Sequence, residues 1–222
     1  MVIDKNYFTN KYKQKIMTNI TLNFYQKNNK QFTSQYNSVD FKSVHQDWLE
    51  FLPEVGALIA DIGAGSGRDV FWLCERGYQV IAVEPVLEFF DQFKKLKQGC
   101  GHKDDINWIV DSLPDLKQLQ EYSQQISLIL LSAVWMHLTT KERIKSFQTF
   151  SILSKINGLL IITLRHGKSP DERVMFPVSI AEIETLAHEN HYQVIAIKKS
   201  NDQLNRSEVF WETIVLEKTT EL

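Results

Sequence analysis

The sequence predicts an α/β protein whose main domain contains a doubly wound sheet of seven strands, mostly parallel. Three observations indicate this class. Short apolar runs alternate with helical patterns from residue 58 onward, a loop with three glycines follows the first run, and the last two runs are joined by a short polar stretch. Alternating strands and helices imply right-handed crossovers between parallel strands. The short final link, with no helix in it, requires an antiparallel hairpin.

The chain before residue 58 is expected to add N-terminal helices to this domain. Residues 1–22 are interpreted as a flexible or covering arm, and residues 23–222 as the domain, with a helical cap or lid over residues 23–53. Residues 1–45 hold seven lysines against two aspartates. A solvated extension is the favoured interpretation of this basic arm, and an anionic partner is the alternative. Asp40 is expected to cap one helix that Pro53 ends.

The elements after residue 58 follow from the apolar pattern. A helix over residues 68–76 ends at Gly77, which suits a left-handed C-terminal position. A second helix is expected to start at Pro85, and a third covers about residues 140–153. The expected strands are residues 58–62, 79–83, 106–110, 126–131, 159–164, 192–198 and 209–216.

The loop after the first strand carries most of the functional information. Gly63, Gly65 and Gly67 stand at alternate positions, where glycine lets the backbone turn sharply and approach a ligand. Loops that hold a pyrophosphate usually place the third glycine three positions after the second, not two. Asp61 would repel a pyrophosphate but attract a cationic group. Glu84, 21 residues after Gly63, can accept hydrogen bonds from both hydroxyls of a ribose.

These residues and the closing hairpin resemble a class I S-adenosylmethionine-dependent methyltransferase, which has a Rossmann-like sheet. The sequences Gly67-Arg68-Asp69 and Arg76-Gly77-Tyr78 are similar to those of small-molecule methyltransferases of the methyltransferase-11/25 and tellurite-resistance kind. The aromatic leader that begins at Phe24 and the late Trp211 are also similar to that group. The resemblance covers nearly everything from Phe24 to Lys218.

The resemblance implies that S-adenosylmethionine is the cofactor. Asp61 would reach its ammonium group directly or through water, and Glu84 would bind the ribose. Arg68 would either hold the cofactor carboxylate or form an intramolecular ion pair. Tyr25, Phe32 or Tyr36 would close over the cofactor, or would only pack the N-terminal helix. The implied cofactor-binding residues are Asp61, Gly63, Ala64, Gly65, Gly67, Arg68, Glu84, Pro85, Asp111, Ser112, Leu113, Ser132, Ala133 and Tyr25.

The segment from Ser132 to Leu138 stands where such enzymes set their reaction preference. It lacks the Asp/Asn-Pro-Pro-aromatic motif of amino-methylating DNA enzymes, and neither cysteine follows a proline. Nucleic-acid bases are therefore not expected as acceptors. His137 is a candidate general base, or it shapes the pocket. Arg165, His166 and Lys168 follow the fifth strand and would bind an acidic substrate or form a solvated loop. Cys100 and His102 alone do not make a metal site.

The favoured hypothesis is methyl transfer from S-adenosylmethionine to a small-molecule nitrogen, oxygen, sulfur or metalloid nucleophile by in-line displacement. The alternatives are an NAD-dependent oxidoreductase and a non-catalytic module that binds S-adenosylmethionine or S-adenosylhomocysteine. No apolar run is long enough to span a bilayer, and residues 1–17 hold no apolar block of the signal-peptide type. A cytoplasmic enzyme with no membrane partner is expected.

Overall fold

A computed structural model describes residues 5–97, 105–204 and 206–220 of the chain. In this part, one seven-stranded sheet has the order β3-β2-β1-β4-β5-β7-β6. The first five strands are parallel, and β7 is antiparallel to both β5 and β6. The expected mixed sheet with a closing antiparallel hairpin is therefore confirmed. The strands are β1 (Leu58–Ile62), β2 (Gln79–Val83), β3 (Ile106–Ile109), β4 (Ile126–Leu131), β5 (Ser154–His166), β6 (Tyr192–Asn201) and β7 (Phe210–Lys218).

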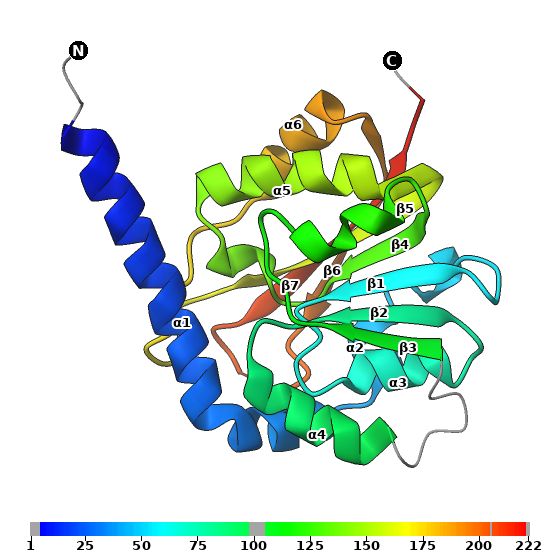
Figure 1. Cartoon of the computed structure of the whole chain (residues 1–222), viewed down its shortest axis with the longest axis horizontal. Coiled ribbons are helices and arrows are strands. Elements are labelled where there is room, and N and C mark those ends of the chain that lie inside the picture. The colour runs from blue at the N-terminus through cyan, green and yellow to red at the C-terminus, as the bar shows by residue number, and fades with distance from the viewer. Residues whose placement is uncertain (1–4, 98–104, 205, 221–222) are drawn as a thin grey trace.

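Helices cover both faces of the sheet. Figure 1 shows α5 (Thr140–Leu153) and α6 (Ile180–Glu189) on one face, and α3 (Arg68–Cys74) and α4 (Leu87–Lys97) on the other. Each face buries its own apolar cluster: Phe147 and Phe150 of α5 pack on one side, and Val70 and Leu73 of α3 on the other. Strands that are buried on both faces explain the continuous apolar run of β4.

Strand β1 lies inside the sheet, between β2 and β4. The strand order reverses here: β2 and β3 extend to one side, and β4 and β5 to the other. Such a switch point opens a crevice at the carboxyl ends of the strands. The glycine loop leaves β1 at this crevice, and the backbone N–H groups of Gly63 and Ala64 donate to the carbonyl oxygen of Val83, at 2.8 and 3.0 Å.

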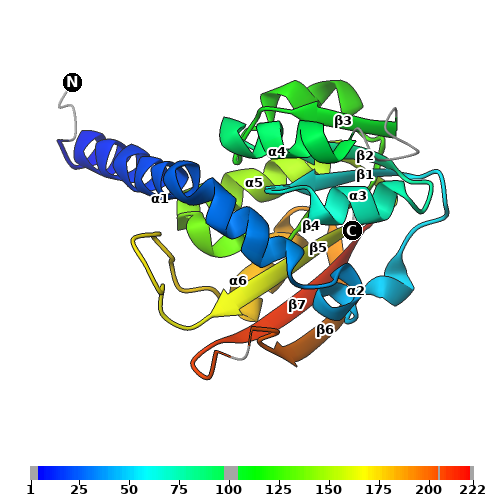
Figure 2. The same ribbon diagram turned by 90° about the horizontal axis from the view of Figure 1, so that it is seen from below.

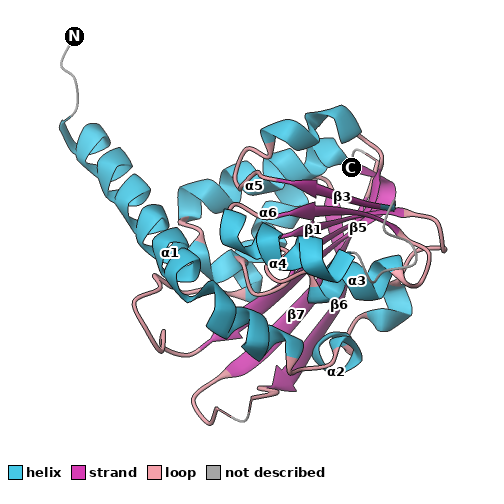
Figure 3. Cartoon of the chain, turned by 60° about the horizontal axis from the view of Figure 1, so that its bottom comes forward, coloured by secondary structure: helices cyan, strands magenta, loops and turns pink. Residues whose placement is uncertain are grey.

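The long helix α1 (Lys5–Asn37) crosses one end of the sheet. Its first turns extend beyond the body of the molecule, and its last turns lie over the strand ends (Figures 2 and 3). The helix is kinked at Asn28, where the backbone leaves helical geometry. None of the described helices is long and apolar enough to cross a membrane.

The helix expected after Asp40 is interrupted. Asp40 caps α2 (Phe41–His45) by accepting from the N–H of Ser43, but a turn separates α2 from the 3-10 helix η1 (Leu49–Phe51). A buried polar chain spans this break: the Trp48 indole donates to Nδ1 of His45, and the other nitrogen of that ring lies 2.9 Å from Asp69.

Other boundaries also differ from the expectation. Helix α4 begins at Leu87 rather than Pro85, and the Glu84 carboxylate accepts the N–H of Val86 just before it, at 2.8 Å. Strand β5 starts five residues earlier than expected, at Ser154. Helix α6 was not anticipated, and Ser179 caps it by accepting from the N–H of Glu182. The 3-10 helices η3 (Lys117–Tyr122) and η4 (Trp135–His137) were not anticipated either.

Candidate active site

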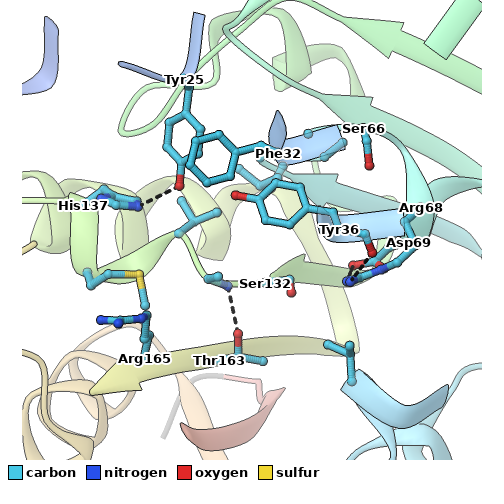
Figure 4. A pocket seen from close by; sticks show the side chains of 18 of the residues that line it. Tyr25, Phe32, Tyr36, Ser66, Arg68, Asp69, Ser132, His137, Thr163 and Arg165 are labelled. Carbon is cyan, nitrogen blue, oxygen red and sulfur yellow. Dashed lines mark hydrogen bonds and ion pairs between the residues drawn. The ribbon is translucent and has the colours of Figure 1, made fainter. Parts of the chain in front are cut away.

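A cavity of about 310 Å³ lies at the carboxyl ends of the central strands. Its floor is formed by the glycine loop and by the ends of β2, β4 and β5, and α1 covers it. Figure 4 shows aromatic side chains of α1 facing His137 and the loop after β4 across this space. Elements that are far apart in the sequence therefore meet at one place.

The cavity gathers nearly all of the residues that the sequence singled out. Asp61 and Gly67 do not line it, although both lie next to residues that do. The predicted residues that line it are Tyr25, Gly63, Ala64, Gly65, Arg68, Glu84, Pro85, Asp111, Ser112, Leu113, Ser132, Ala133 and His137, together with Phe32, Tyr36 and Arg165.

The glycine loop has a backbone that other residues adopt poorly. Gly63 and Gly65 have φ values of +82° and +52°. A Cβ atom on Gly63 would lie 2.6 Å from Cγ2 of Val134, whereas one on Gly65 would lie 3.7 Å from the Tyr36 ring. The loop is therefore pressed against the segment after β4 and lies beneath α1.

Glu84 joins the glycine loop to the start of α4. Its two carboxylate oxygens accept the backbone N–H groups of Gly65, at 2.9 Å, and of Val86, at 2.8 Å. Burial raises the pKa of Glu84 to about 7, although the two hydrogen bonds oppose the rise. Because each carboxylate oxygen has a second lone pair, the side chain can still accept from a bound hydroxyl pair.

Asp61 is a buried carboxylate below this loop, 2% exposed. Its Oδ2 atom has no hydrogen-bond partner within the part of the chain that the structure describes. Burial, and then the negative charge of Asp69, raises the pKa of Asp61 well above its usual range, while Arg68 opposes this effect. A buried carboxylate with a free oxygen fits a cationic group such as an ammonium.

Arg68 forms the intramolecular ion pair that was one of its two expected roles. Its Nε and Nη2 atoms donate to the two carboxylate oxygens of Asp69, at 2.6 and 3.0 Å. Asp69 also contacts His45, and its contacts with His45 and Arg68 hold the pKa of Asp69 well below its usual range despite its burial. The pair fixes the start of α3 beside the glycine loop (Figure 4).

Two loops complete the floor at β3 and β4. The carboxylate of Asp111 accepts the N–H groups of Ser112, at 2.8 Å, and Gln118, at 2.7 Å, which fixes the loop after β3. Ala133 has a positive φ of +59°, and its N–H donates to Oγ1 of Thr163, at 2.8 Å. The turn after β4 is thus tied to β5.

A hydrogen-bonded chain fastens α1 over the cavity. The Tyr25 hydroxyl lies 3.3 Å from Nε2 of His137 and accepts from Nη1 of Arg173, at 2.9 Å. The Arg173 guanidinium lies 4.6 Å from the centre of the Phe32 ring, within cation–π range. A second fastening joins the N–H of Val174 to Oγ1 of Thr21, at 3.0 Å.

His137 is held as a neutral imidazole. Its Nδ1 atom lies 2.9 Å from the carbonyl oxygen of Val174, which only accepts, so Nδ1 carries the proton. The Nε2 atom is then an acceptor for the Tyr25 hydroxyl. Burial lowers the pKa of His137 to about 4, although the bond to Val174 opposes this fall.

Several lining residues were missed because they lie in polar segments that the sequence pattern assigns to solvated loops. Asp171 and Arg173 form one paired unit, and Asp202 and Arg206 form another. The sequence does contain a signal for these units, since each places an aspartate two or four residues before an arginine, a spacing that allows an ion pair. The lining residues missed in these segments include Arg173, Met175, Asp202, Gln203 and Arg206.

The remaining candidates lie elsewhere. His166 pairs with Glu212, at 2.9 Å, and stacks on Phe210, outside the cavity lining. Lys168 is exposed and does not line the cavity. Cys100 and His102 fall outside the described residues.

Comparisons with known proteins agree with this geometry. Residues 59–158 match a family model described as a methyltransferase domain. A 1,6-didemethyltoxoflavin-N1-methyltransferase of Burkholderia thailandensis, solved with its substrate and S-adenosylhomocysteine, is similar in structure. The TM-score is 0.61 at 16% identity, over 85% of this chain and 88% of that one.

Two further structures have the same fold. An S-adenosylmethionine-dependent methyltransferase of Methanosarcina mazei gives a TM-score of 0.62 at 15% identity, over 82% of this chain and 100% of that one. Phosphoethanolamine N-methyltransferase 2 of Haemonchus contortus, solved with S-adenosyl-L-methionine, gives 0.62 at 14% identity, over 81% of this chain and 53% of that one. No curated protein matches the sequence.

Proposed function

Because the chain carries a methyltransferase domain within a class I methyltransferase fold, we propose that it moves the methyl group of S-adenosylmethionine to a small-molecule nucleophile. The acceptor atom is a nitrogen, oxygen, sulfur or metalloid centre. The observation that carries this proposal is the pair of buried carboxylates beside the glycine loop. Glu84 lies at the end of β2 facing the cavity, and Asp61 lies below the loop with one free oxygen.

The two carboxylates fit the two polar ends of this cofactor. The ribose hydroxyls would donate to Glu84, which keeps lone pairs beyond the two that its backbone donors use. The ammonium of the methionine part would lie toward Asp61. Ser112 and Leu113 would flank the adenine, and Ser132 and Ala133 would border the sulfonium.

When bound, the cofactor supplies a methyl carbon on a positively charged sulfur, an activated leaving group. Ser132 and Ala133, at the turn after β4, would border the place where an acceptor lone pair meets this carbon. The residues of the chain hold the two molecules in line under α1 and keep water out. Positioning of this kind lowers a barrier by as much as about 7–11 kcal/mol.

His137 and Tyr25 would handle a proton only where the acceptor loses one. The single lone pair of Nε2 already accepts from the Tyr25 hydroxyl, so a proton would reach His137 through that hydroxyl. A pKa of about 4 makes His137 a weak base at neutral pH. We therefore assign the rate mainly to alignment, with His137 holding Tyr25 over the cavity.

Calorimetry with S-adenosylmethionine and S-adenosylhomocysteine tests the cofactor. Glu84→Ala should weaken binding of both by at least about tenfold, because a charge-assisted bond to the ribose is lost. Glu54→Ala, at an exposed position away from the cavity, is the matched control. The absence of binding to the unaltered protein at high micromolar concentration would sink the proposal.

Two alternatives make different predictions. An NAD-dependent oxidoreductase would bind NADH, which a fluorescence titration detects; the glycine spacing and the buried Asp61 disfavour a pyrophosphate here. A non-catalytic module would bind the cofactor tightly, methylate nothing in a broad acceptor screen and form a stable complex with another protein.

A further inference from the structure

The lining of the cavity is rich in arginine. Among the described residues, four arginines line the cavity: Arg68, Arg165, Arg173 and Arg206. A guanidinium binds a carboxylate best through a fork of two parallel N–H bonds. The partner that each guanidinium binds therefore shows which of the four arginines is left without a carboxylate.

Three of the four forks hold an aspartate of the protein itself. The Nε and Nη2 atoms of Arg173 donate to Asp171, at 2.8 and 2.7 Å. The same two atoms of Arg206 donate to Asp202, at 2.9 and 2.6 Å. Arg68 holds Asp69 in the same way. Each of these three positive charges is therefore balanced next to the cavity.

Arg165 is the exception. Its Nη1 atom donates to the carbonyl oxygens of Gly167 and Lys168, at 3.1 Å each, and contacts Sδ of Met175, at 3.4 Å. Its Nε atom is buried and has no partner, and no ion pair of this residue is found among the described residues. The nearby Glu212 is taken by His166 and Lys199.

This unpaired cation is built into the fold. Arg165 is 6% exposed and lies near the end of β5, where its backbone pairs with Trp211 of β7. Thr163, two residues earlier on the same face of the strand, is bonded to Ala133 beside the expected methyl-transfer point. Figure 4 shows Arg165 on the His137 side of the cavity and Arg68 across from it.

Burial and the positive charges of Arg206 and Arg173 lower the pKa of Arg165, while Asp202 and Asp171 oppose this effect. The neighbouring arginines are paired with aspartates, whereas the buried charge of Arg165 has no carboxylate partner among the described residues, which costs free energy unless an anion arrives. An anion bound here would also be attracted by the cationic sulfur of the methyl donor.

We propose that the methyl acceptor is a small molecule with a carboxylate group, and that this carboxylate binds the guanidinium of Arg165, which no carboxylate of the described residues neutralises. This inference rests on the proposed methyl transfer and specifies the substrate class of the same site. Arg165 is then a specificity-determining residue: the carboxylate is held beside β5, and the nucleophilic atom is directed toward the turn at Ser132.

A binding experiment tests the proposal without knowledge of the full acceptor. The proteins are the unaltered chain, Arg165→Gln, Arg165→Lys and the control Lys168→Gln, which removes an exposed positive charge three residues away. Each is loaded with S-adenosylhomocysteine and titrated with acetate, benzoate and their amides, with the melting temperature as readout. The same titrations are run on the protein without cofactor.

At least one carboxylate should stabilise the unaltered protein and the control, and neither amide should. Arg165→Gln should weaken that binding by at least about 30-fold. The affinity of Arg165→Lys for the carboxylate should lie between those of the unaltered protein and Arg165→Gln, because an ammonium is a point charge that cannot make two parallel bonds. The lysine variant also provides the comparison if the glutamine variant fails to fold. Equal responses to acids and amides, no carboxylate response, or an unchanged affinity in both Arg165 variants would each overturn the proposal.

Calorimetry with S-adenosylhomocysteine separates this proposal from the more general one. Its affinity should agree within about threefold among the four proteins, because Arg165 lies away from Glu84 and the glycine loop. A loss above about tenfold in Arg165→Gln alone would assign the fork to the cofactor carboxylate and overturn an acceptor role. Failure of the unaltered protein to bind S-adenosylhomocysteine would instead refute the methyltransferase function, and the titrations without cofactor would still report on the carboxylate site.

Discussion

The single residue Glu84 is a buried binding group whose ionised form lowers the stability of the folded protein. It is buried at the edge of the cavity, where only two backbone N–H groups compensate its charge. The unfolded chain has no such burial, so the folded protein holds the proton of Glu84 more tightly. A site prepared for a hydroxyl pair thus disfavours its own ionised form until a ligand arrives.

This has a measurable pH dependence. The pKa of Glu84 rises from 4.5 to about 7 on folding, so between these values the folded state keeps a proton that the unfolded chain has lost. The stabilising contribution of that proton is therefore lost as pH rises through this window. In Glu84→Gln this loss is absent. As pH rises from 4.5 to about 8, the free energy of unfolding of the variant should therefore increase by about 1–3 kcal/mol relative to that of the unaltered protein.

Urea unfolding of both proteins at a series of pH values gives this difference. His137, with its lowered pKa, contributes equally to both proteins and cancels. The charge of Glu84 helps to raise the pKa of Asp61, so its removal should relieve Asp61 as well and add to the gain in the same direction. Parallel stability curves would show that Glu84 ionises normally in the folded state.

The sequence identified residues whose chemistry is local. Glu84 and the glycines follow directly from a strand end, where the position in a parallel sheet fixes what a side chain faces. Arg173 and Arg206 could not be found in this way. Their place at the cavity depends on how two polar segments fold back over β5 and β7, and on ion pairs that only the tertiary structure brings together.

At the scale of elements, the glycine loop and α1 form the two walls of the site. The loop is fixed by conformations that side chains adopt poorly, and α1 is fixed by contacts with the loop between β5 and α6. The two walls should respond to different changes: the loop to added bulk, and α1 to lost hydrogen bonds.

Gly63→Ala tests the loop. The positive φ and the approach of Cβ to 2.6 Å from Val134 should together destabilise the protein by about 2–4 kcal/mol. Gly56→Ala is the matched control, because its φ of +91° carries the same backbone strain with nothing within 4 Å. Thermal unfolding should show a larger loss for Gly63→Ala than for Gly56→Ala, and Val134→Ala in the same chain should recover part of the excess. Equal losses at both glycines would mean that backbone strain alone matters.

Arg173→Gln tests α1. The change removes the donor to the Tyr25 hydroxyl and the cation over the Phe32 ring. Amide exchange in residues 20–37 should become faster, with about 1–3 kcal/mol less protection, while β1 and β4 stay protected. Unchanged exchange in this segment would show that packing alone holds the helix.

The elements themselves were predicted well where local signals agree. Helix α5 has a full capping box at Thr139, and β4 is an uninterrupted apolar run, and both have the expected bounds. The helix after Asp40 has the expected start and cap, but it is shorter than expected: it ends at His45, whose ring contacts Asp69, far along the chain. Tertiary contacts of this kind leave no trace in a short window of sequence.

At the scale of the whole molecule, the cavity links ligand binding to global stability. S-adenosylhomocysteine at 100 times its dissociation constant should stabilise the fold by about 2.7 kcal/mol. For a chain of this size, the melting temperature should rise by about 5–10 °C. Differential scanning fluorimetry measures this shift, and NADH at the same concentration should give none. A shift with NADH and none with S-adenosylhomocysteine would contradict the proposed cofactor.

The sheet order has a consequence for how the protein is made. Strand β7 follows β6 in the chain but lies between β5 and β6, so β6 leaves the ribosome before its neighbour exists. Until residues 210–218 emerge, β5 has an open edge and β6 has no partner, and open edges invite pairing with other chains. Translation that stalls after β6 should therefore yield a product that aggregates or requires a chaperone.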